Sequence, residues 1–196
     1  MADFTKSGAQ VDEWAQVAVN ATREGAAISI PDDVGILVEI AVAHDSTNAH
    51  ANGAQVILEG SGNTSGDEDW SEILSVRSDG GTATQANVDQ ESTGTSLYVD
   101  LTTGFVTRMK KFFIKNNTIA NSEIGRVESW AADDAIGCVD SLTNTQEVTA
   151  DVFNIVNDWI FRVPKEFRRA RVLVFNDDAD CTICSRTRKA IATDIE

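Results

Sequence analysis

The stretch Ile36-Leu37-Val38-Glu39-Ile40-Ala41-Val42 decides the fold of this chain. Side chains of a strand point alternately to its two faces, so residues two apart share a face. In this stretch the shared face is wholly apolar, and it consists of Ile36, Val38, Ile40 and Val42. A polar run at residues 44–48 then ends the pattern. The stretch therefore predicts a core strand with one buried face, followed by a loop.

Similar short segments follow one another along the chain, separated by residues that favour turns. They recur at spacings of roughly 10–15 residues, without a long helical repeat, which is typical of antiparallel sandwiches and jelly rolls. We predict an all-β fold, an antiparallel β-sandwich of jelly-roll type with long loops and little helix. The expected strands lie at residues 15–22, 26–30, 36–42, 54–58, 70–76, 97–101, 112–114, 125–130, 148–156, 159–163 and 171–175.

A chain of 196 residues forms one large domain or two small ones. At roughly 150–200 residues a chain hides about 70% of its unfolded surface, which is enough for a hydrophobic core. We expect residues 1–25 to form an N-terminal arm or a first strand, although Val11, Trp14 and Ala18 also fit a helical spacing. Residues 26–196 are expected to form a single β-sandwich domain, and the polar stretch at 77–95 is a candidate hinge within it.

Charge is distributed unevenly between the two halves of the chain. Residues 1–105 carry 17 acidic and 3 basic side chains, and residues 106–196 carry 14 and 13, so the net charge is −15. Proteins that bind nucleic acid present clustered Lys and Arg to the phosphates, so this balance argues against such a partner. No stretch approaches the roughly 20 apolar residues that span a membrane, and no apolar leader follows Met1. We expect a protein made in the cytoplasm, without a nucleic-acid or membrane partner.

The basic residues gather late in the chain, around Pro164 and near the C-terminus. A solvated charged loop is the simplest interpretation of each group. The alternative is an interface with an acidic surface on a neighbouring copy, because this same chain supplies one. Head-to-tail contacts of opposite charge can close into rings, so we predict an assembly surface. Its candidate residues are Lys165, Arg168, Arg169, Arg171, Arg186 and Arg188.

No motif in the chain names a reaction. Cys181 and Cys184 form a C-x-x-C, but the acidic run at 176–180 before them raises a thiol pKa, and an odd count of three cysteines argues against a disulfide framework. The acidic run at 176–180 lacks the glycine and glutamate that a calcium loop requires. For this run and for the one at 67–69, a solvated turn is the simplest interpretation, and Ca²⁺ bound with help from backbone carbonyls is the alternative. We therefore expect no catalytic residue, metal or cofactor. A metal-dependent hydrolase built on His44, Asp45 and His50 is the enzymatic alternative.

Aromatic side chains offer a second alternative. In lectin-like sandwiches, rows of aromatic rings stack on sugars, and this chain has four tryptophans: Trp14, Trp70, Trp130 and Trp159. Each lies in or beside an apolar segment, so core packing is the simpler interpretation. The glycine-rich run at 60–66 lacks the lysine of a phosphate-binding loop, which leaves it as a flexible loop. A carbohydrate-binding β-sandwich module is thus the alternative function.

Two parts of the chain resemble virion structural proteins of tailed viruses. They are Phe112-Phe113-Ile114-Lys115-Asn116-Asn117-Thr118, and Arg171-Val172-Leu173-Val174-Phe175-Asn176 followed by Arg186-Thr187-Arg188. Small all-β proteins of that kind decorate capsids or build rings and collars at the tail. The resemblance implies a non-enzymatic, symmetric assembly role, with other copies of the chain and other virion proteins as partners. It also implies a place in the virion after synthesis in the host cytoplasm, and it carries over no functional residue.

Overall fold

The alternating stretch at 36–42 forms a buried strand in the computed structural model of the chain, which describes residues 9–31, 35–66, 69–88, 91–100, 102–108, 110–131 and 134–191. Strand β4 (Ile36–His44) lies inside a four-stranded antiparallel sheet of order β1-β15-β4-β13. As predicted, Ile36, Val38 and Ile40 are fully buried. The other strands of this sheet are β1 (Ala9–Val17), β13 (Val156–Val163) and β15 (Ile183–Ile191).

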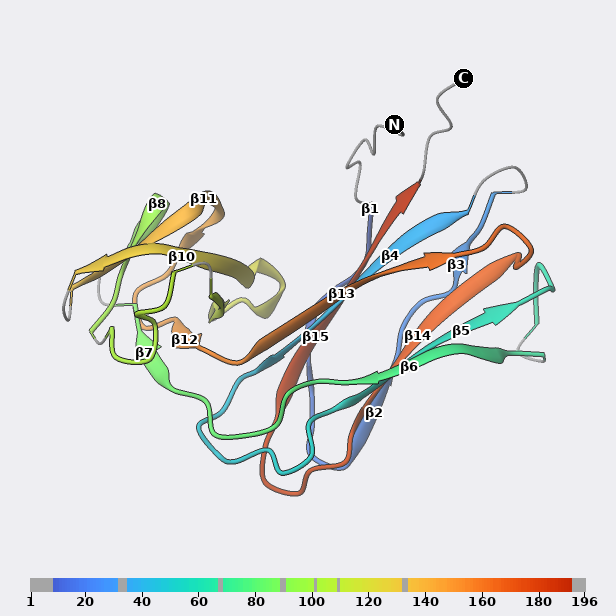
Figure 1. The fold of residues 1–196 in the computed structure, drawn as a ribbon, viewed down its shortest axis with the longest axis horizontal. Helices are drawn as coiled ribbons and strands as arrows, with labels where there is room; N and C mark the ends of the chain where they lie inside the picture. Colours follow the sequence, from blue (N-terminus) through green and yellow to red (C-terminus); the bar gives the residue numbers. More distant parts are fainter. Residues whose placement is uncertain are drawn as a thin grey trace.

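A second sheet packs against the buried face of β4. Its order is β2-β14-β5-β6, and β3 pairs with β14. Its strands are β2 (Ala21–Glu24), β3 (Ile28–Ser29), β5 (Gln55–Ser61), β6 (Ser71–Arg77) and β14 (Arg169–Asn176). Val38 and Ile40 of the first sheet share one core with Val56, Leu58 and Val172 of the second. The all-β, antiparallel, sandwich-like class is confirmed, and strands from both ends of the chain build the sandwich (Figure 1).

The middle of the chain forms a third sheet of six strands, ordered β7-β12-β9-β10-β11-β8. We call residues 85–153 the second lobe; Figure 1 shows its strands beside the sandwich. The lobe has its own core, which includes Leu97, Phe112, Val127, Ile136 and Val152. Its strands are β7 (Gln85–Asn87), β8 (Ser92–Tyr98), β9 (Lys111–Lys115), β10 (Glu123–Ala131), β11 (Ala135–Gln146) and β12 (Asp151–Phe153).

The two lobes meet on the outer face of the four-stranded sheet. Trp14 of β1 packs against Phe113 of β9, with ring centroids 4.6 Å apart. Ala41, Ala43 and Cys184 belong to the same buried cluster. The sandwich and the second lobe therefore have separate cores joined by a third, aromatic cluster, while the domain boundary expected at residue 25 stays a prediction.

Some strand bounds differ from the expected ones, each for a local reason. Residues 148 and 149 form a turn, with Thr149 at a φ of 71°, so the strand expected at 148–156 is wrong at its start. The 12-residue strand β11 was not predicted, because its outward face is polar and its buried residues are widely spaced. Strand β1 contains Val11 and Trp14 despite their helical spacing, since register irregularities between Gln10 and Ala15 distort the period-two pattern.

Candidate functional site

The first group of basic residues lies on β14 and in the loop before it. Arg171 of β14 forms salt bridges with Glu59 of β5 at 2.7 Å and with Glu24 of β2 at 2.5 Å. Because β14 lies between β2 and β5, Arg171 is directly opposite Glu59. Its guanidinium also lies over the ring of Trp70, 4.4 Å from the centroid. Arg171 is therefore held by partners within the chain.

Arg169 is also anchored within the sheet. Its Nε donates to the carbonyl of Asn63 at 2.8 Å, and its Nη2 donates to the carbonyl of Gly66 at 2.6 Å. Lys165 and Arg168 are exposed in the loop between β13 and β14. The candidate residues around Pro164 thus divide into two anchored on β14 and two on an exposed loop.

The second basic group lies on β15. Arg186 is only 6% exposed, and its Nη2 donates to Glu39 at 3.0 Å. Its guanidinium lies over Trp14, 4.9 Å from the ring centroid. Burial lowers the pKa of Arg186, and the positive charge of Arg188 lowers it further. Arg188 is two residues along the strand and partly exposed, so both side chains project toward the face that carries the second lobe.

The second lobe covers only part of the outer face of the four-stranded sheet. Trp159 and Phe161 of β13 pack against the sandwich core, so Ile160 between them projects outward. Ile160 is 65% exposed, the highest value among the exposed large hydrophobic residues of the described chain. Register places Glu39 of β4 opposite Ile160 and Leu37 opposite Arg162, and it places Arg188 of β15 on the other side of Glu39, all on the same face. We call this surface the outer strip, and it consists of Leu37, Glu39, Ile160, Arg162 and Arg188.

A cleft of about 260 Å³ lies where the second lobe meets the four-stranded sheet. Arg186 and Arg188 line one wall; the short 3₁₀ helix η1 (Ile119–Asn121) and the adjoining ends of β10 and β11 line the other. Glu123 in that second wall accepts hydrogen bonds from the backbone N–H groups of Thr143 at 2.9 Å and Asn144 at 3.2 Å. Arg186 and Arg188 were candidate residues from the sequence, but no motif indicated that they would line a cleft.

Asp45 is fully buried at the junction and connects both lobes. Its carboxylate accepts from Gln16 at 2.5 Å and from the hydroxyl of Thr182, and it forms a salt bridge with Lys115 of the second lobe at 3.1 Å. The sequence placed Asp45 between two histidines as a candidate for proton transfer or metal binding. Its partners come instead from β1, β9 and the segment before β15, and Lys115 carried no sequence signal.

His44 and His50 lie side by side, buried, with ring centroids 5.3 Å apart. The Nε2 of His44 is 3.2 Å from the carbonyl oxygen of Asp79, and the Nε2 of His50 is 2.9 Å from Oδ1 of Asn176. Burial lowers the pKa of His44, and neighbouring His50 lowers it further. Within the described ranges, no group of three or more His, Cys, Asp or Glu side chains is arranged to hold a metal ion. The metal-dependent hydrolase stays a prediction.

The cysteines are buried thiols. Burial raises the pKa of Cys181 to about 11, and the carboxylates of Asp178 and Asp45 raise it further, as the acidic run predicted. Burial also raises the pKa of Cys138 to about 12, and the charge of Glu123 adds to this. The pKa of Cys184 is likewise raised by burial and by Asp45. Thiolates are the reactive form, so this environment disfavours thiol chemistry at neutral pH.

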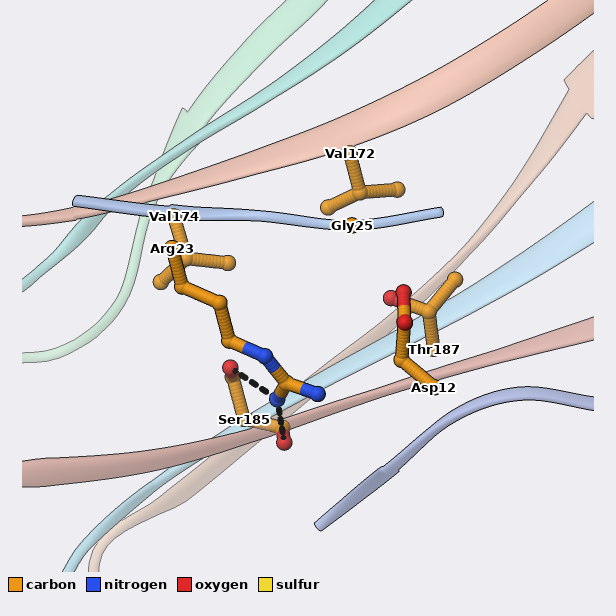
Figure 2. A pocket seen from close by; sticks show the side chains of 7 residues that line it. All are labelled: Asp12, Arg23, Gly25, Val172, Val174, Ser185 and Thr187. Atoms are coloured by element: carbon orange, nitrogen blue, oxygen red, sulfur yellow. Dashed lines mark hydrogen bonds between the residues drawn. The ribbon is translucent and has the colours of Figure 1, made fainter. Parts of the chain in front are cut away.

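A second hollow lies between the two sheets of the sandwich, where Figure 2 shows Arg23 reaching from β2 toward Ser185 of β15. The guanidinium donates to the carbonyl and the hydroxyl oxygen of Ser185 and to the carbonyl of Glu13. Burial lowers the pKa of Arg23, and the charge of nearby Asp12 partly offsets this. The hollow has no room for a water molecule, so it is an internal polar contact between the sheets.

The four tryptophans do not form a row. Trp14 is buried at the lobe junction, and Trp159 packs against the sandwich core. Trp70 is partly buried and lies near two guanidinium groups on the sandwich, whereas Trp130 is exposed on β10 of the second lobe. A shared sugar-stacking platform therefore has no geometric support in the described chain, and glycan binding stays a prediction.

Comparison of the chain with family models, curated proteins and solved structures finds no match in any of the three. In the part of the chain that the structure describes, no helix is long and apolar enough to cross a membrane.

Proposed function

We propose that this chain is a non-enzymatic virion structural protein that forms symmetric oligomers or decorates a capsid or tail. The observation that carries the proposal is the outer strip, where Ile160 is 65% exposed on β13, the terminal strand of its sheet. A terminal strand presents unpaired backbone groups, and an exposed large apolar side chain on it favours docking of another surface. The resemblance to virion structural proteins of tailed viruses supports the same role. Other copies of the chain and other virion proteins are the proposed partners.

The charges of the outer strip specify the chemistry of its partner. Arg162 lies beside Leu37 in one register row, and Arg188 lies in the row of Ile160, with Glu39 between them. A surface that fits this strip has an apolar centre with carboxylates around it. The chain itself has a net charge of −15, so another copy supplies such carboxylates. Charge then guides association and makes it sensitive to salt, while buried apolar area holds the contact.

The test is the mass of the intact chain in solution, measured by light scattering at low and high salt. We expect a mass above that of the monomer for the wild type and a monomer for Ile160→Glu, because the substitution places a carboxylate at the centre of the contact. Val148→Glu is the matched control, since Val148 is also exposed, at 47%, but lies in a turn of the second lobe. Its mass should equal that of the wild type.

A charge reversal tests the rim of the same contact. Reversing Arg169 or Arg171 would break contacts inside the sandwich, so Arg162→Glu is the better variant; it should weaken association most at low salt. A wild type that stays monomeric at both salt concentrations, with no virus particle co-purifying, would refute the proposal. Equal masses for Ile160→Glu and Val148→Glu would refute the placement of the contact on the outer strip.

A further inference from the structure

The cleft between the lobes has the composition of a binding site, and of the outer strip it shares Arg188. It is formed by β1, the 119–123 segment, the end of β11 and β15, which are brought together only when the second lobe packs on the sandwich. At about 260 Å³ it holds several waters at roughly 30 Å³ each, or one small organic group. Most drug-sized pockets are larger, so the size favours a small ligand.

One wall of the cleft is cationic. Arg186 and Arg188 are two residues apart on β15 and both line the cleft. Only one nitrogen of Arg186 is engaged by Glu39, and Asp158 contributes a weaker favourable charge. The two guanidiniums repel each other, as the effect of Arg188 on the pKa of Arg186 shows. An anion between them would relieve that repulsion.

Trp14, one of the residues that line the cleft, carries a buried donor without a partner among the described residues. The residue is only 2% exposed, and the donor is its indole Nε1–H. Buried donors are nearly always paired, so an acceptor brought into the cleft is a suitable partner for this one. Indole nitrogen donates only, which requires an oxygen atom on the ligand.

The acidic groups near the cleft limit the charge of the ligand. Glu123 is occupied by two backbone N–H groups and by the side chain of Gln146, so its charge is satisfied locally. Glu13 is exposed at the rim. With Glu39 already on Arg186, a carboxylate, which carries one negative charge per group, suits the cleft better than a phosphate, which concentrates two charges on one group.

We propose that this cleft binds a carboxylate group, held by Arg186 and Arg188 and hydrogen-bonded to the indole of Trp14. Guanidinium and carboxylate groups are both planar and form bidentate pairs with two parallel hydrogen bonds, which supports this ligand class. The carboxylate belongs either to a small organic acid or to an acidic side chain of a protein. Both sources present the same chemistry to the cleft.

The test uses the indole N–H resonances of the ¹⁵N-labelled full chain, titrated with malonate against matched chloride. We expect one of the four indole signals to move saturably, and Trp14→Phe identifies it. If that variant fails to fold, sequential assignment of the wild type replaces it. Arg188→Gln should weaken malonate binding by at least about tenfold, the loss typical of a charge-assisted hydrogen bond, and Arg188→Lys should restore part of it. Arg126→Gln, on the second lobe, is the matched control and should bind as the wild type.

Further arms of the titration distinguish the sources of the carboxylate. A Trp14 signal that moves with protein concentration in the absence of malonate indicates an acidic side chain from another copy; one that moves only with malonate indicates a small acid. Either result supports the site, even if the chain is monomeric in light scattering. The proposal is overturned if the Trp14 signal ignores malonate, if Arg188→Gln binds as tightly as the wild type, or if phosphate moves the signal as strongly as malonate.

Discussion

The substitution Asp45→Asn tests whether the buried ion pair holds the two lobes together. The side chain of Asp45 has no exposed surface, and its carboxylate faces the ammonium of Lys115 at 3.1 Å. The amide can present its oxygen to Lys115 and its nitrogen to the hydroxyl of Thr182, which is able to rotate and accept. The hydrogen bonds then survive in part, and the main loss is the negative charge that balances Lys115.

The size of the loss follows from burial. Removing one partner of a fully buried ion pair costs about 3–5 kcal/mol. Lys115 retains 23% exposure, so water partly compensates its unpaired charge and the expected loss in free energy of unfolding falls to about 2–3 kcal/mol. For a chain of this length, 1 kcal/mol shifts Tm by roughly 2–4 °C. The expected fall in Tm is therefore roughly 4–12 °C.

Urea unfolding of a double-mutant cycle measures the pair itself. The cycle combines Asp45→Asn with Lys115→Met. The two losses of stability should be less than additive, because Lys115→Met removes the positive charge that Asp45→Asn leaves without a partner. Asp140→Asn is the matched control, since Asp140 pairs with Arg126 on the surface and should change stability by less than about 1 kcal/mol. Equal losses for Asp45→Asn and Asp140→Asn, or strict additivity in the cycle, would show that the junction does not depend on this ion pair.

Three further outcomes are expected. Because burial and His50 lower the pKa of His44, the folded chain binds fewer protons than the unfolded chain just below the ordinary pKa of 6.5. This contribution to stability is complete above the ordinary pKa and is lost as pH falls from there through the lowered pKa. His44→Gln should therefore flatten the decline of urea stability below about pH 6.5, and an unchanged slope would contradict this. None of the three raised-pKa cysteines should react with a thiol reagent near pH 8 until urea unfolds the chain, and rapid labelling of the native chain would contradict their burial. Gly125→Ala should lower the free energy of unfolding by about 1–3 kcal/mol, because the added Cβ would lie 2.3 Å from the ring of Phe112. Gly62→Ala is the control, since its Cβ would meet no atom within 4 Å, and it should lower the free energy of unfolding far less. Similar melting points for the two variants would contradict the tight packing at Gly125.

The core strands were predictable where one face is wholly apolar. Strand β4 is the best example, since its alternation of Ile36, Val38 and Ile40 needs only the pleat of a strand and a hydrophobic core. Strand β11 was not predictable, because its outward residues are polar and its pairing with β8 and β10 is non-local. The acidic run predicted part of the raised pKa of Cys181, through Asp178, whereas burial, the larger cause for all three cysteines, came from the tertiary structure. The burial of Arg186 was not predictable from the sequence, since a charged side chain is expected to be exposed unless a partner from another strand pairs with it.

The amino-acid sequence by itself determined the strand content and the uneven distribution of charge, because alternation and composition are local properties of the chain. Only the tertiary structure decided which of these charged residues pair with one another. Antiparallel pairing places the late strands β14 and β15 against β2, β4 and β5 from the acidic half. The resulting ion pairs join the two halves within one molecule: Arg171 with Glu24 and Glu59, Arg186 with Glu39, and Lys115 with Asp45. Residues far apart in sequence become neighbours through strand pairing and lobe packing, so Arg171 and Arg186 are paired within the molecule, while Arg162 and Arg188 lie at the surface on the outer strip.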